Sequence, residues 1–323
     1  MIVQVLLILL GFILLVKGAD ILVDGSATIA KKFHIPEIII GLTIVSIGTS
    51  LPELFVSLTS AIKGHSDMSM GNVIGSNVCN LLLILGLSAA IKTIRFKRET
   101  RKFEIPFSLA VVVLFFIICN LGQSVSRIDG IILLLVFLVF IGYTTVMAKK
   151  GIDYEKQDKD ADIEMAEQKA KKEYTTVKAI ANIILGIVAL KFGGDFVVDN
   201  AEKIALAFNI SEKIIGLTIV AIGTSLPELV TSVTAAIKGD SDIAIGNILG
   251  SNIFNMLMII GVTAVITPIN YALSYNSQLL ILFIATILLM IFPYTGKVNR
   301  MTRINGFMYL ALYIVYMIGL AVA

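Results

Sequence analysis

Charged residues are scarce in this sequence. Only 15% of its 323 residues are Asp, Glu, Lys or Arg, and 57% are hydrophobic, whereas a soluble domain carries about 25% charged residues. The mean hydropathy is +0.93. This composition excludes a soluble enzyme, a disordered chain and a disulfide-rich secreted module. The net charge of +3 leaves no basic domain surface for nucleic acid, so nucleic acid is not an expected partner.

Cysteine and histidine are almost missing as well. Cys79 and Cys119 both lie in apolar runs, which favours buried, inert thiols over a bridge or a metal pair. We interpret His34 and His65 as surface residues. Zinc and copper are therefore not expected, because both prefer imidazole or thiolate ligands.

Long apolar runs fill most of the chain. A helix needs about 20 apolar residues to cross a bilayer, and ten runs meet that need. The sequence therefore predicts an all-α integral membrane protein with ten transmembrane helices, and ten such runs leave no polar surface for a soluble fold. The predicted spans are 2–30, 36–62, 70–91, 104–122, 128–147, 179–200, 213–237, 245–267, 278–294 and 304–322.

Basic residues are distributed unevenly between the connecting segments. Twenty fall in the segments on one side of the predicted membrane and four in those on the other. The positive-inside rule then places both termini outside the cell. We expect a multi-pass protein of the plasma membrane, with lipid as its surroundings and the hydrophilic segment 148–178 as a charged cytoplasmic linker.

The sequence repeats itself at a constant offset of 175 residues. Residues 41–80 align without gaps on 216–255, and 27 of the 40 positions are identical. Residues 1–147 and 179–323 thus form two repeats of five spans each. Because five is odd, the second repeat should enter the membrane from the opposite side. Inverted repeats of this kind are typical of secondary transporters, although duplication alone would also suit a channel.

The motif GTSLPE occurs in the middle of an apolar run in both repeats and ends at Glu53 and Glu228. A carboxylate at the bilayer centre costs about 2.5–3.5 kcal/mol on insertion scales, so such residues are usually functional. The motifs contain no Lys or Arg to act as a fixed partner. We therefore expect a bound cation or a proton to neutralise them, rather than a purely structural role.

Hydroxyl groups precede each glutamate at helical spacing. Thr49 and Ser50 lie on the same helical face as Glu53. Pro52 lacks an N–H and should free a backbone carbonyl near Gly48, which could serve as an ion ligand. Carboxylate, hydroxyl and carbonyl oxygens are the ligands that calcium prefers. The second repeat carries the same set, namely Thr224, Ser225, Pro227 and Glu228.

A second motif, GNxxGSNxxN, occupies 71–80 and 246–255. Its glycines indicate close helix packing, which could be its whole role. Its polar residues recur every four positions, and we expect that stripe to face the carboxylates. The stripe consists of Asn72, Ser76 and Asn80 in the first repeat and of Asn247, Ser251 and Asn255 in the second.

Four aspartates are also paired by the repeat. They are Asp20 and Asp24 in the first span and Asp195 and Asp199 in the sixth. Helix anchoring or hydrogen bonding is the simpler interpretation, and access of ions to the site is the alternative.

With these motifs, the chain resembles the sodium/calcium exchanger group of the calcium/cation antiporter superfamily, of the prokaryotic type with two alpha repeats. The resemblance covers essentially the whole chain. It implies cation sites between spans 2, 3, 7 and 8, and long first and sixth spans that slide against the core. The metal ligands that it implies are Glu53, Glu228, Thr49, Ser50, Ser76, Asn80, Thr224, Ser225, Ser251 and Asn255, with the carbonyls of Ser46 and Ala221.

One position departs from part of that family. Some members carry Asp where this chain has Asn255, and here both Asn80 and Asn255 are neutral. Two carboxylates balance one calcium ion or two sodium ions, so the number of sodium ions exchanged stays open.

We expect an antiporter that exchanges calcium for sodium by alternating access. It should need no cofactor, catalyse no chemical reaction and require no obligate protein partner. A calcium/proton or broader cation exchanger is the alternative, a cation channel is a more distant one, and an intramembrane hydrolase lacks a second catalytic motif.

Overall fold

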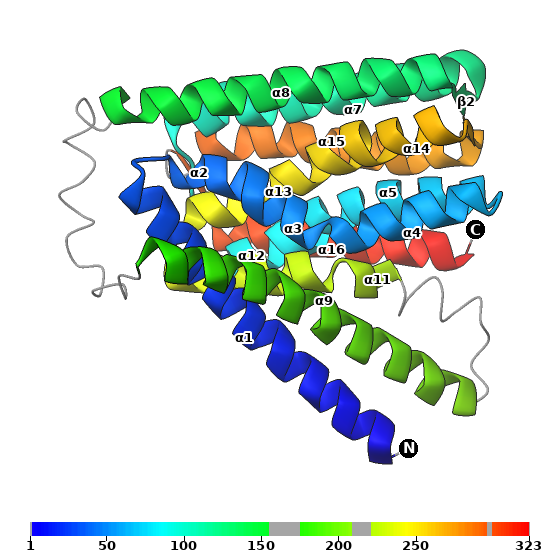
Figure 1. Cartoon of the computed structure of the whole chain (residues 1–323). Helices are drawn as coiled ribbons and strands as arrows, with labels where there is room; N and C mark the ends of the chain where they lie inside the picture. The colour runs from blue at the N-terminus through cyan, green and yellow to red at the C-terminus, as the bar shows by residue number, and fades with distance from the viewer. Residues whose placement is uncertain (1, 155–174, 209–220, 296–298, 323) are drawn as a thin grey trace.

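The computed structural model describes residues 2–154, 175–208, 221–295 and 299–322, and these residues are almost entirely helical (Figure 1). Within the described residues, eight helices are long and apolar enough to cross a membrane, or nine if a bent pair over 37–62 counts as one span. The prediction of a helical membrane protein is confirmed. The number ten stays a prediction, because the expected span 213–237 begins outside the described residues.

Two long helices lie against each other and extend obliquely from one side of the bundle (Figure 1). They are α1 (Ile2–Lys32) and α9 (Thr176–Ala207). Gly11 faces the carbonyl oxygen of Gly193 and Gly18 faces that of Gly186, so the two helices are antiparallel. A Cβ atom added to Gly11 would lie 2.8 Å from the Gly193 oxygen. Small residues at these positions let the two backbones touch.

The centre of the bundle is built from interrupted helices that carry the repeated motifs. In the first repeat they are α2 (Glu37–Ile40), η1 (Gly41–Val45), α3 (Ser46–Thr49), α4 (Leu51–Ile62), α5 (Ser66–Val78), η2 (Cys79–Leu85) and α6 (Gly86–Ile91). In the second they are α11 (Ala221–Thr224), α12 (Leu226–Lys238), α13 (Ser241–Ile253), η6 (Phe254–Ile259) and α14 (Ile260–Ile266).

Each GTSLPE motif breaks its helix at the serine. Ser50 has φ −87° and ψ 8°, and Ser225 has φ −88° and ψ 5°. The proline two residues later has no N–H for the bond back to the preceding turn, so a new helix begins. Between 37–49 and 51–62 the axis bends by 48°. The span predicted as one helix over 36–62 is therefore two segments, because hydropathy does not register a change of direction.

Each GNxxGSNxxN motif runs from an α-helix into a π-helix. The π segments η2 and η6 begin at Cys79 and Phe254, which are equivalent positions in the repeat. Close glycine contacts join the two repeats here, since a Cβ on Gly41 would lie 2.9 Å from the Cα of Gly246. π-helical turns often mark functional sites. Both motifs therefore meet in the buried centre of the molecule.

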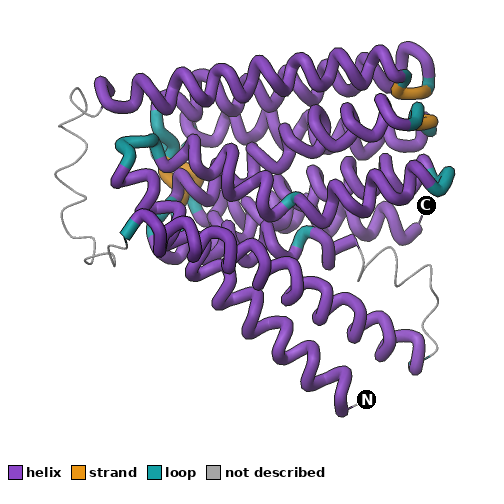
Figure 2. The backbone as a smooth tube through the Cα atoms, in the orientation of Figure 1, coloured by secondary structure: helices purple, strands orange, loops and turns teal. Residues whose placement is uncertain are grey.

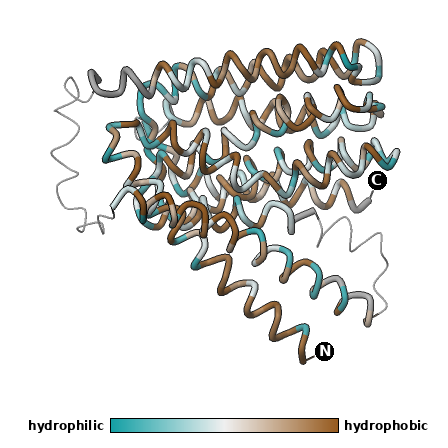
Figure 3. Tube along the Cα trace, in the orientation of Figure 1, coloured by the Kyte–Doolittle hydropathy of each residue, from teal (hydrophilic) through white to brown (hydrophobic). Residues whose placement is uncertain are grey.

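The outer helices consist mostly of apolar residues, which are brown in Figure 3, and many of their side chains are exposed. Val139 and Val315, for example, are 68% and 67% exposed. Such a surface suits lipid contact. The outer elements are η3 (Thr100–Glu104), α7 (Ile105–Gly122), α8 (Arg127–Tyr154), η7 (Leu273–Tyr275), α15 (Asn276–Ile291), η8 (Phe292–Tyr294) and α16 (Arg303–Val322).

Two short antiparallel sheets join the repeats, one at each end of the bundle (Figure 2). They pair β1 (Ile94–Arg95) with β4 (Arg300–Met301), and β2 (Ser124–Val125) with β3 (Ile269–Asn270). The offset of 175 residues makes β1 equivalent to β3, so equivalent strands lie at opposite ends.

The helices extend beyond the hydropathy boundaries of the predicted linker. α8 continues to Tyr154 and α9 begins at Thr176, whereas the linker was expected over 148–178. Hydropathy marks the part of a helix that lies in lipid, and charged helix ends in water go undetected. Residues 155–174 lie outside the described part of the chain.

Candidate ion-binding site

Glu53 and Glu228 occupy equivalent places in the first turn of α4 and α12. Each is 1% exposed. The first turn of a helix has free backbone N–H groups and a partial positive charge, which favours a carboxylate there. Among the described residues, no basic side chain bonds to either carboxylate. Each negative charge is thus buried in a position that partly stabilises it but leaves it unpaired.

Serine hydroxyls connect each glutamate to the opposite repeat. Ser50 Oγ donates a hydrogen bond of 2.8 Å to Glu228 Oε1, and the Ser225 hydroxyl lies close to the Glu53 carboxylate. Ser225 Oγ also lies 3.4 Å from Ser76 Oγ. The contacts cross between the halves, so both carboxylates belong to one site.

Several buried oxygens of the repeated motifs, the carboxylates included, have no hydrogen-bond partner among the described residues. A buried oxygen without a donor costs about 1–3 kcal/mol, and native proteins rarely contain many. Six of them in repeated motifs are explained if a cation is their partner, since hard cations bind sets of oxygens. The six atoms are Oε2 of Glu53 and Glu228, Oδ1 of Asn80 and Asn255, Thr224 Oγ1 and Ser251 Oγ.

Some of the remaining predicted ligands already take part in hydrogen bonds within the protein. Thr49 Oγ1 donates to Asn247 Oδ1 at 3.1 Å. The Ser46 carbonyl accepts from the Ser50 N–H at 3.0 Å and from Thr49 Oγ1 at 3.3 Å, so it takes part in helical bonding. Ala221 begins α11, and its side chain lies outside the described residues. The ligand roles of the Ser46 and Ala221 carbonyls stay predictions, as do those of the other predicted ligands.

Asn72 and Asn247, at equivalent positions of the second motif, donate hydrogen bonds to the main-chain carbonyls of the two glutamates. Asn72 Nδ2 donates to the Glu53 carbonyl at 3.3 Å and to Ser57 Oγ at 2.9 Å. The equivalent Asn247 Nδ2 donates to the Glu228 carbonyl at 3.5 Å and to Ser232 Oγ at 2.9 Å. Ser57 and Ser232 were not predicted as part of the site, although their identity in the two repeats was a signal that could have found them.

A second asparagine network joins α5 and η2 to α13 and η6. Asn80 Nδ2 donates to Asn252 Oδ1, and Asn255 Nδ2 donates to Asn77 Oδ1, both at 3.0 Å. Asn77 and Asn252 also donate to each other's main-chain carbonyls, at 3.4 and 3.3 Å. All four side chains are at most 1% exposed. Sequence reasoning placed Asn77 and Asn252 in the motif but assigned them no role.

The repeated aspartates have different partners in the two halves. Asp20 and Asp24 each bond to Lys238 Nζ at 2.6 Å, which fastens α1 to the end of α12. Asp195 instead pairs within its own helix with Lys191, at 2.7 Å. Anchoring, the simpler interpretation, accounts for Asp20 and Asp24.

One more ion pair joins Lys97, outside the membrane spans, to the first turn of the spanning helix 241–266. Lys97 Nζ is 2.9 Å from Asp242 Oδ2, and the negative charge of Asp242 raises the pKa of Lys97. This pair fastens the segment before η3 to the first turn of α13. It lies at the end of the helices and contacts neither glutamate.

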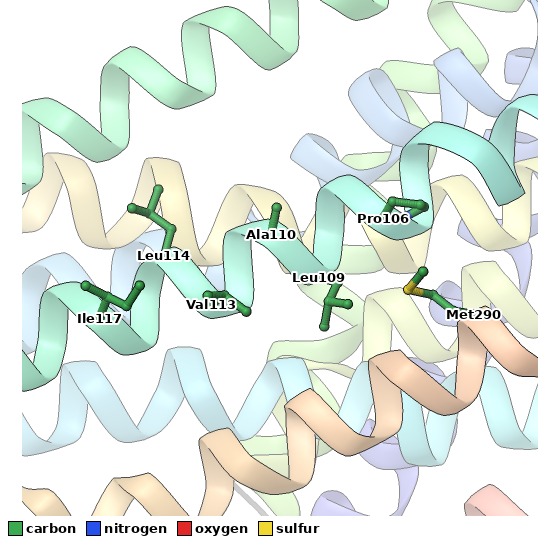
Figure 4. A pocket seen from close by; sticks show the side chains of 7 residues that line it. All are labelled: Pro106, Leu109, Ala110, Val113, Leu114, Ile117 and Met290. Atoms are coloured by element: carbon green, nitrogen blue, oxygen red, sulfur yellow. The ribbon is translucent and has the colours of Figure 1, made fainter.

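A hollow on the outer surface, between α7 and α15, has a volume of about 410 Å³ (Figure 4). Its lining is apolar and includes Leu109, Val113 and Met290. Such a lining offers no side-chain oxygen to a cation, so the hollow is not a second ion site.

Comparison with known proteins gives one consistent result. The family model described as "sodium/calcium exchanger protein" matches residues 3–146 and 178–322. A putative antiporter, CaxA of Alkalimonas amylolytica, is 37% identical, and the sodium/calcium exchanger MaX1 of Methanosarcina acetivorans is 31% identical. Each match covers 98% of both chains. A solved structure of the sodium-calcium exchanger NCX_Mj, soaked without sodium or calcium, matches with a TM-score of 0.84 and 35% identity over 99% of both chains.

Proposed function

The chain belongs to the sodium/calcium exchanger protein family, and from that premise we propose that it exchanges calcium for sodium across the membrane by alternating access. Membership makes it a multi-pass transporter of the cation antiporter type rather than an enzyme. The observation that carries the proposal is the pair of buried glutamates at equivalent positions of the two repeats, one of which accepts a hydrogen bond from a serine of the opposite repeat.

The architecture proposed for this function is ten spans in two inverted repeats, 1–147 and 179–323, joined by a charged linker. Three observations support it. Equivalent strands lie at opposite ends of the bundle. The equivalent helices α1 and α9 are antiparallel. The described ends of the chain lie at one end of the molecule, and the end of α8 and the start of α9 lie at the other (Figure 1).

The proposed ligands are oxygen atoms of both repeats, with calcium and sodium as the transported substrates. In each repeat, four ligand residues come from the broken helix and two from the helix that continues into a π segment, α5–η2 or α13–η6. They are Ser46, Thr49, Ser50, Glu53, Ser76 and Asn80, with Ala221, Thr224, Ser225, Glu228, Ser251 and Asn255 as their equivalents.

Charge balance explains why binding one ion should exclude the other. Two carboxylates neutralise one calcium ion or two sodium ions, and a further cation would be an unbalanced charge in a low dielectric. A bound ion shifts the conformational equilibrium only by its differential affinity for the two states. We expect the loaded site to permit rearrangement, whereas two unneutralised carboxylates oppose it. Because only the loaded site rearranges, calcium can move in one direction only if sodium moves in the other.

Flux into liposomes tests the proposal. Purified protein in sodium-loaded liposomes should take up labelled calcium when external sodium is removed, and uptake should stop when sodium is equal on both sides. Uptake driven by a pH gradient alone would instead identify a proton-coupled exchanger. Uptake that needs no counter-ion gradient would identify a channel.

Substitution of the glutamates identifies the site in the same assay. Glu53→Gln and Glu228→Gln should each abolish uptake, because each removes half of the balancing charge. Glu104→Gln is the matched control, since Glu104 is also 1% exposed but belongs to η3, outside the proposed site. Normal uptake by either site variant would contradict the assignment.

A further inference from the structure

We propose that Asn77 and Asn252 are positioning residues that turn the amide oxygens of Asn80 and Asn255 toward the transported cation. The inference rests on the proposed function, because it concerns the same site. Neither residue belongs to the proposed ligand set. Each acts on a ligand of the opposite repeat, Asn77 on Asn255 and Asn252 on Asn80.

Two main-chain carbonyls determine the orientation of the asparagine amides, because a carbonyl can only accept a hydrogen bond. The carbonyl of Asn252 accepts from Asn77 Nδ2 at 3.4 Å, and that of Asn77 accepts from Asn252 Nδ2 at 3.3 Å. These bonds fix which end of each amide is nitrogen. The Oδ1 atoms of Asn77 and Asn252 must therefore point away from these carbonyls.

Those two oxygens then determine the orientation of the next pair of amides. Asn77 Oδ1 accepts from Asn255 Nδ2, and Asn252 Oδ1 accepts from Asn80 Nδ2, both at 3.0 Å. A reversed amide would set oxygen against oxygen. As a result, the Oδ1 atoms of Asn80 and Asn255 point away from the network. Both are buried and accept no hydrogen bond from the described residues.

The orientation matters because the two ends of an asparagine amide have nearly the same shape but opposite polarity. The oxygen attracts a cation, whereas the NH2 group repels it. Removal of the acceptor at residue 77 would let the Asn255 amide rotate and present nitrogen to the site. Loss of the acceptor at 252 would do the same to Asn80.

The proposed orienting role is tested by replacing Asn77 or Asn252, which removes the accepting Oδ1 atom. The measurement is equilibrium binding of labelled calcium to the purified, detergent-solubilised protein. Asn77→Leu and Asn252→Leu keep the branched shape of the side chain without its polar atoms, and each should weaken calcium binding about tenfold, as expected when a residue that orients a metal ligand is lost. Asn77→Ala removes the same acceptor with less steric demand and should show the same loss if the leucine variant does not fold.

Aspartate at the ligand positions distinguishes orientation from general damage. A carboxylate presents an oxygen whichever way it rotates, so Asn77→Leu should cost less than twofold in an Asn255→Asp background. In an Asn80→Asp background it should still cost about tenfold. Asn252→Leu should show the reverse, with its loss removed by Asn80→Asp and kept in Asn255→Asp.

A control variant separates this effect from the loss of an amide pair elsewhere in the bundle, here a partly buried one. Asn120 and Asn276 exchange hydrogen bonds of 3.0 and 2.8 Å at the ends of α7 and α15, and Asn120→Leu should leave calcium affinity unchanged. Equal losses from Asn77→Leu in all three backgrounds would overturn the inference. If Glu53→Gln also bound calcium normally, the proposed function itself would fail, so the two failures are distinguishable.

Discussion

Ser50 links the two halves of the molecule with a single hydroxyl. It terminates α3 in the first repeat, yet its hydrogen bond goes to Glu228 in the second. This bond stabilises one carboxylate oxygen of Glu228, and the other, Oε2, has no hydrogen-bond partner among the described residues and is the atom that we propose as a cation ligand. A residue that ends a helix thus also positions a charge across the repeat interface.

Ser50→Ala should weaken calcium binding by about tenfold, because a hydrogen bond to a charged group is lost. Equilibrium binding of labelled calcium measures the change. Ser60→Ala is the matched control: Ser60 is also buried in α4, and the second repeat already carries alanine at the equivalent position, Ala235. Equal calcium affinity in both variants would show that the Ser50 bond does not contribute to the site.

The sequence alone identifies the repeated glutamates and their neighbours as candidate site residues, because a charged residue inside an apolar run can be recognised without a structure. It does not predict the partners. Asn252 and Asn80 are 172 residues apart in sequence, and the direction of their hydrogen bond depends on which amide end faces which carbonyl. Such information exists only after the helices have packed.

The pairing of α1 with α9 depends on glycine at the scale of whole helices. A Cβ atom on Gly193 would lie 2.8 Å from the Gly11 oxygen and 2.9 Å from the Leu15 nitrogen. Both are backbone atoms, so the helices would have to separate. The same geometry that holds the two helices together also suits their movement as one unit.

Gly193→Ala should destabilise the protein by about 1–3 kcal/mol, the usual cost of overpacking. The midpoint of thermal unfolding in one detergent is the measurement. In Gly142→Ala, by contrast, the added Cβ meets nothing within 4 Å, so this variant should unfold at the wild-type temperature. Identical midpoints for the two variants would contradict the close contact between α1 and α9.

Hydropathy predicts where most helices lie but not how they are interrupted. Apart from Asn80 and Asn255, the π segments η2 and η6 contain ordinary apolar residues, and nothing in that pattern predicts their wider turns. The break at Ser50 was signalled by Pro52, yet its 48° bend depends on the helices around it. The direction of each helix segment and the register of its turns therefore depend on how the helices pack.

Across the whole molecule, the two repeats carry nearly the same residues in different contacts. Lys238 joins Asp20 and Asp24. Its equivalent, Lys63, is exposed and has no ion partner among the described residues. Under alternating access, this asymmetry is expected, because the two repeats exchange conformations between states.

Lys238→Met should loosen the part of α1 near Asp20 and Asp24, because both aspartates lose their partner. Hydrogen exchange of the peptides covering residues 18–32 should become faster than in the wild type. Lys63→Met serves as the matched variant and should leave exchange in α1 unchanged. Unchanged exchange in Lys238→Met would mean that the ion pair does not hold α1 in place.

Competition between the two ions tests the central claim, a single site shared by calcium and sodium, most directly. Labelled calcium binding to the purified protein should be measured at a series of sodium concentrations. The account predicts that sodium raises the apparent Kd for calcium while calcium bound at saturation stays constant, and that Glu228→Gln loses the binding. Calcium affinity that does not change with sodium would contradict it.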